Sequence, residues 1–155
     1  MKRCKGISMI SLTVAVCILL ILSSMLIYNA ESGIKIKKIE MMKRDIELLD
    51  GKINSYYAKY DDIPVGIEYT NTSLLDKIKL SGQIEQEDNN VYYVIDLNKL
   101  DGITLNYGKE FSNINSETDI ANNDDIYIIN EQSHSIYYVR GIEMDNAWYY
   151  TDTSK

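Results

Sequence analysis

The chain has 155 residues with 23 acidic and 16 basic side chains, a formal net charge of −7 and two cysteines. This length holds one small domain beside any targeting or membrane segment. The acidic balance argues against nucleic acid as a direct partner, because phosphate binding needs clustered Lys and Arg. Both cysteines, Cys4 and Cys17, lie near the N-terminus, so we expect no disulfide in the rest of the chain.

The first thirty residues divide into a basic leader, residues 1–6, and an uncharged segment, residues 7–30. A helix of these 24 residues spans about 36 Å at ~1.5 Å per residue, which is enough to cross a bilayer. A secretory signal peptide has a shorter apolar region. Because Lys2, Arg3 and Lys5 precede the apolar segment, the positive-inside rule places the N-terminus in the cytoplasm and the remainder outside. The sequence therefore predicts a single-pass protein of the cell membrane.

The leader and the residues after it resemble the prepilin signal of type IV pilins and type II secretion pseudopilins. In that family a peptidase cuts after a glycine and the new N-terminus is methylated, which implies cleavage between Gly6 and Ile7 and N-methylation of Ile7. The family's pattern continues with a small or hydroxyl residue, two apolar residues and a glutamate. Here Ser11 stands at the glutamate position. That carboxylate neutralises a neighbouring subunit's amine in the family, so its replacement implies a minor subunit.

The resemblance implies a structural protein and not an enzyme: a minor pilin or pseudopilin of a type IV pilus-like or type II secretion-like filament. Its implied partners are other pilin or pseudopilin subunits, the prepilin peptidase and the membrane, with no cofactor. Secretion, DNA uptake, adhesion and motility remain open as the system it serves. The alternative is an uncleaved single-pass membrane protein with an external sensing or scaffolding domain, in which Gly6 is incidental.

Residues 31–62 continue the helix with an amphipathic pattern. Apolar residues recur at steps of three and four, which predicts one buried stripe: Ile39, Met42, Ile46, Leu49, Ile53, Tyr56 and Tyr60. The segment Asp61-Asp62-Ile63-Pro64 should end the helix, because proline disfavours helical geometry in the preceding residue. The stripe is expected to pack on the chain's own sheet, with a parallel coiled-coil dimer as the alternative.

Residues 63–155 are expected to form a loop region and an antiparallel β domain, which makes the fold class α+β and pilin-like. A short helix is predicted within 72–82, an exposed polar segment at 83–90 and a loop at 112–125. The alternating pattern predicts strands at 91–97 and 103–107, and hairpins from 126–129 with 135–139 and from 142–144 with 147–150. Half of the tyrosines in these strands should face the helix and half should cover the outer face of the sheet.

Candidates for chemistry are few. The single histidine, His134, lies in a predicted hairpin loop, and one imidazole forms neither a catalytic triad nor a zinc site. Asp124 and Asp125 offer the oxygen ligands that calcium prefers, but Asn and Asp are equally common in ordinary loops and EF-hand spacing is absent. No metal site is expected, and these two carboxylates are the candidates if calcium binds.

Overall fold

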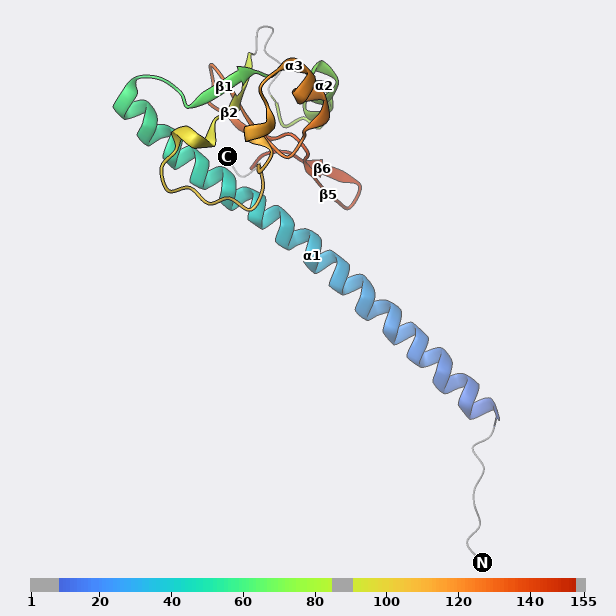
Figure 1. Ribbon diagram of the computed structural model, residues 1–155. Coiled ribbons are helices and arrows are strands. Elements are labelled where there is room, and N and C mark those ends of the chain that lie inside the picture. Colours follow the sequence, from blue (N-terminus) through green and yellow to red (C-terminus); the bar gives the residue numbers. More distant parts are fainter. Residues whose placement is uncertain (1–8, 85–90, 153–155) are drawn as a thin grey trace, which may run out of the picture.

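The computed structural model describes residues 9–84 and 91–152. It opens with a continuous helix, α1 (Met9–Tyr60), of 52 residues, which is about 78 Å long at ~1.5 Å per residue. The remaining elements gather around the C-terminal half of α1, and the N-terminal half projects away from them (Figure 1). A mixed α+β fold with a long N-terminal helix and a C-terminal antiparallel sheet is thereby confirmed.

The helix ends where the sequence predicts. Asp61 adopts a positive φ of 53° and its N–H donates to the carbonyl of Tyr57 at 2.8 Å, which is an αL cap of the last turn. Pro64 follows three residues later and is buried. The leader, Gly6 and Ile7 lie outside the described residues.

The predicted apolar stripe is the face of α1 that packs on the domain, chiefly on β4 (Ile136–Tyr138) and β5 (Ile142–Met144). Five of its seven residues are buried: Ile39, Met42, Ile46, Leu49 and Ile53. Its last member, Tyr60, is exposed, because the sheet does not extend to the end of the helix. The stripe is therefore covered by the chain's own sheet, as expected.

The main sheet has four antiparallel strands in the order β1-β2-β3-β4, from β1 (Val65–Glu68) through β2 (Tyr92–Ile95) and β3 (Tyr127–Asn130) to β4. The β3–β4 hairpin and a separate hairpin of β5 with β6 (Ala147–Tyr149) confirm both predicted hairpins. Asp145 and Asn146 form the second turn at φ values of 51° and 63°, the conformation of a type I′ turn.

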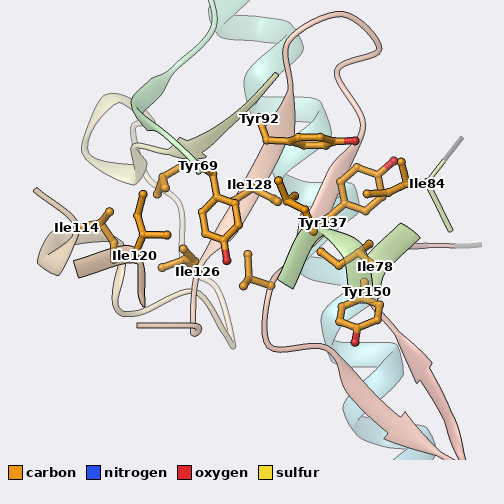
Figure 2. Close-up of a cluster of buried hydrophobic side chains, with 13 residues drawn as sticks. Tyr69, Ile78, Ile84, Tyr92, Ile114, Ile120, Ile126, Ile128, Tyr137 and Tyr150 are labelled. Carbon is orange, nitrogen blue, oxygen red and sulfur yellow. The ribbon is translucent and has the colours of Figure 1, made fainter. Parts of the chain in front are cut away.

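The sheet separates two apolar clusters. One lies between the sheet and α1 and includes Tyr127, Ile129 and Tyr138. The other lies on the opposite face, where α2 (Thr72–Leu80) and α3 (Glu117–Asn122) add Ile78 and Ile120 to a cluster that includes Tyr92 and Tyr137 (Figure 2). The tyrosines do divide between the two faces. Those on the outer face are themselves buried in a second core.

Four local predictions were wrong. Residues 103–107 form no strand but an irregular segment held by α1, and 112–125 contains the 3₁₀-helix η2 (Phe111–Asn113) and α3. The strand predicted to reach residue 97 stops at Ile95, because Asp96 caps a 3₁₀-helix, η1 (Leu97–Lys99), by accepting from the N–H of Asn98. Gln83 and Ile84, expected to be exposed, are half-buried and buried. The rest of that segment, 85–90, lies outside the described residues.

Candidate functional site

The exposed apolar half of α1 is the largest candidate site. It is long and apolar enough to cross a membrane, and none of its most apolar window is buried against the rest of the described chain. Large apolar side chains point outward around the whole circumference, among them Leu12, Leu19, Leu20, Ile21 and Leu22. A helix that is apolar all round requires an apolar environment, which is lipid or other apolar helices.

The hydroxyl groups in this half are compatible with lipid. The Ser23 hydroxyl donates to the carbonyl of Leu19 at 2.7 Å, and Ser24 and Thr13 make the same bond four residues back at 3.0 and 3.2 Å. Each hydroxyl is satisfied within the helix, so the polar groups of these residues carry no unpaired donor into the membrane. Ser11, the residue at the family's glutamate position, lies in the first turn of α1 and is exposed.

A buried carboxylate links α1 to the domain. Asp45 is 2% exposed and accepts hydrogen bonds from the backbone N–H groups of Asn106 and Tyr107, each at 2.9 Å. The Asn106 side-chain amide and the Tyr127 hydroxyl add bonds of 2.9 and 3.1 Å. Burial, reinforced by Asp45, raises the pKa of Tyr127 well above its ordinary value, so this hydroxyl remains a donor. Asp45 therefore fixes the segment after residue 102 against the helix.

The sequence contains a signal for Asp45 that the stripe analysis passed over. Asp45 lies three residues after Met42 and four before Leu49, which puts it on the apolar stripe itself. A carboxylate at such a position is buried only if donors reach it, because burying an unpaired charge is costly. The backbone donors are the N–H groups of Asn106 and Tyr107, which follow Asp45 by 61 and 62 positions in the sequence. No local pattern identifies them.

The two calcium candidates contact different partners. Asp125 accepts from the N–H of Gly108 at 2.7 Å and from the Tyr138 hydroxyl at 2.9 Å. Asp124 pairs with the Arg140 guanidinium at 2.6 Å, which raises the pKa of Arg140. Both carboxylates thus hold protein donors, and the described residues contain no group of three or more His, Cys, Asp or Glu side chains placed to hold a metal.

A cavity of about 380 Å³ lies where α1 meets the edge of the main sheet. Glu47 and Asp50 line it from α1, and Asp152 lines it from the C-terminal segment, among apolar side chains such as Ile46 and Ile136. His134 also lines it, at a φ of 56° in the β3–β4 turn, with its ring 5.5 Å from that of Tyr57. The cavity combines an acidic rim with an apolar wall, a lining suited to a long cationic side chain.

In comparisons with protein-family models, with curated proteins and with solved structures, nothing matches this chain.

Proposed function

We propose that the chain is a minor pilin or pseudopilin, a structural subunit of a type IV pilus-like or type II secretion-like filament. The observation that carries this proposal is the leader ending in Gly6, followed by a helix whose exposed half is apolar on every side. Such a helix serves as a membrane anchor before assembly and as a packing surface within a filament. The pilin-like architecture is part of the same proposal.

In this function the chain is inserted with Lys2, Arg3 and Lys5 in the cytoplasm and the β domain outside. Prepilin peptidase cuts between Gly6 and Ile7, and Ile7 receives the N-methyl group. The apolar half of α1 then packs against the helices of other subunits. Contact between close-packed helices provides the attraction, because lipid tails are as apolar as the side chains they surround.

Ser11 supports a minor role. A serine hydroxyl can accept a hydrogen bond from the amine of a neighbouring subunit, but it cannot neutralise its charge. A filament built only of this chain would bury an uncompensated amine at each repeat, which is costly. A subunit present in few copies, among others that carry the acid, avoids that repeated cost.

The N-terminus of the membrane-bound protein provides the test. We expect intact-mass analysis to show a chain that begins at Ile7 and carries one methyl group. Gly6→Leu should leave Met1 in place and exclude the protein from filaments. Gly33→Ala is the matched control, because a Cβ at Gly33 meets nothing within 4 Å, and it should be processed normally. A wild-type protein that retains Met1 in cells with active prepilin peptidase would favour an uncleaved single-pass protein with a sensing or scaffolding domain.

A further inference from the structure

We infer that the stem of α1, residues 31–38, docks on the acidic cavity edge of a second copy of this chain. The inference rests on the proposed function, because two copies inserted in one membrane hold their α1 helices parallel. The groups that make the contact are the ammonium groups of Lys35 and Lys38 on one copy, and the carboxylates of Glu47 and Asp50 on the other.

The cavity edge can receive a lysine side chain. Glu47 and Asp50 stand one helical turn apart on α1, with Asp152 across the cavity from them. The edge already binds an ammonium group of its own chain, since Lys43 Nζ lies 2.8 Å from Asp152 Oδ1. Ile46 and Ile136 provide an apolar wall along which the methylene groups of a lysine can lie.

The stem is available for such a contact. Every residue from Gly33 to Lys38 is exposed, and α1 leaves the domain beside β5 and β6 and continues alone (Figure 1). Lys35 and Lys38 are three residues apart and therefore share one face of the helix, as Glu47 and Asp50 do. The two lysines and the two carboxylates thus have the same spacing on parallel helices.

One shift along the helix aligns three of the four charged residues of the stem with opposite charges, and the fourth, Lys37, with Leu49. Twelve residues separate Lys35 from Glu47 and Lys38 from Asp50, and the same step brings Glu31 to Lys43. Twelve helical residues correspond to a stagger of about 18 Å. Without a stagger each lysine would face its own counterpart. The contact joins two different surfaces of the chain, so it does not close into a symmetric dimer, and in a subunit present in few copies it joins one copy to the next without building the whole filament.

Because of the stagger, docking between two copies depends on filament assembly. Raising one copy by about 18 Å moves more than half of a ~30 Å hydrocarbon span out of the bilayer. The apolar side chains that leave the lipid must be covered by the helices of other subunits. We therefore expect the stem contact in assembled filaments and not between separate subunits in the membrane.

Cysteine cross-linking tests the register. In a Cys17→Ala background, Lys35→Cys combined with Glu47→Cys should give disulfide-linked dimers when cells that make the filament are oxidised. The control pairs Lys37→Cys with Glu47→Cys, because Lys37 lies about 200° around the helix from Lys35. We expect at least about fivefold more cross-linked product from the first pair, given the narrow distance range of a disulfide.

Charge exchange tests the electrostatics at the second pair. With Lys38→Cys and Asp50→Cys as the reporter, Lys35→Glu should lower the yield roughly threefold, and adding Glu47→Lys should restore it. Lys109→Glu, at an exposed loop position, should leave the yield unchanged. Raising the salt concentration should weaken the reporter signal, since exposed charges are screened within about 10 Å at 0.1 M.

Equal yields from the Lys35 and Lys37 pairs, in a protein that begins at Ile7 and is present in filaments, would overturn the docking and leave the proposed function standing. A protein that retains Met1 and is absent from filaments would overturn the proposed function itself. A strong Lys35 pair that the charge exchange fails to affect would overturn the assignment of the contact to these charges.

Discussion

The two halves of α1 have the same backbone conformation and opposite relations to their surroundings. From residue 11 to residue 25 the helix carries apolar residues on every side, and the side chains there are exposed. From Ile39 onward only one stripe is apolar, and that stripe is buried on the sheet. Helix formation is common to both halves, so the number and the arrangement of apolar residues determine which surroundings each half requires.

Each half of α1 also has a separate source of stability. The stripe contributes by removing apolar area from water when the domain folds. The apolar window of the other half is not buried by the rest of the described chain, so its side chains need apolar surroundings from outside the chain. Equivalent substitutions in the two halves should therefore affect different measurements.

The largest expected effect comes from truncating a buried leucine. Leu49 is 0% exposed, and Leu49→Ala should lower the free energy of unfolding by about 3–5 kcal/mol, through lost burial and the cavity left behind. Leu19→Ala in the exposed half should leave this free energy unchanged. Urea unfolding of the full-length protein in detergent, followed by Trp148 fluorescence, measures both. An equal loss for the two variants would show that the halves are not independent.

A charge in the membrane half should affect insertion and not folding. Leu20→Lys should cost about 2.5–3.5 kcal/mol of insertion free energy and reduce the carbonate-resistant membrane fraction. Leu48→Lys, at an exposed position in the domain half, is the control and should be retained like the wild type. Full retention of Leu20→Lys would contradict a membrane position for this half.

The sequence predicted the elements that depend on local pattern. The stripe, both hairpins, the helix at 72–80 and the end of α1 follow from periodicity, from turn residues and from Pro64. The segment 103–107 alternates as a strand does, but Asp45 takes its backbone N–H groups at residues 106 and 107. A long-range hydrogen bond of this kind overrides local propensity, and only the folded chain shows it.

The candidate site was predictable to a similar extent. The leader and apolar helix are contiguous in sequence, and the pattern alone predicted a helix long and apolar enough to cross a membrane. The cavity joins α1 to residues about 35 to 105 positions further along, because Glu47 and Asp50 meet Gln83, His134 and Asp152 there. Its acidic rim is therefore a product of the fold, and the sequence indicates only the charged face of the helix that contributes to it.

Removing the charge of Asp45 should loosen the segment that it holds. Asp45→Asn keeps one acceptor oxygen but replaces the other with an amide NH₂ group, which faces donors of Asn106 in either orientation of the amide. We expect a loss of about 2 kcal/mol in the free energy of unfolding, as for buried donors left unsatisfied. Hydrogen exchange at these two amides should accelerate more than exchange in β3. Asp76→Asn, at an exposed position of α2, should leave both measurements near the wild type. Unchanged exchange in Asp45→Asn would show that other contacts hold the segment.

The smallest expected effect distinguishes two buried tyrosines by pH. Tyr69 is 2% exposed, and its hydroxyl makes no hydrogen bond to any residue that the structure describes. Burial, and then the charge of Asp124, raises the pKa of Tyr69 above its ordinary value of 10. The unfolded chain therefore loses this proton first as the pH rises. The corresponding stability is fully present below pH 10 and is lost above it, by about 1.4 kcal/mol at pH 11.

Tyr69→Phe should therefore change the free energy of unfolding little at pH 7 and make the protein less sensitive to alkali, because phenylalanine has no proton to lose. Tyr138→Phe is the contrasting variant. Its hydroxyl donates to Asp125 at 2.9 Å, so its removal should cost about 1–2 kcal/mol already at pH 7. Urea unfolding at pH 7 and pH 11 measures both variants. A marked loss for Tyr69→Phe at pH 7 would show that its hydroxyl has a partner in the folded protein. Buried tyrosine hydroxyls would then form stabilising hydrogen bonds in the outer cluster as well as in the cluster that faces α1.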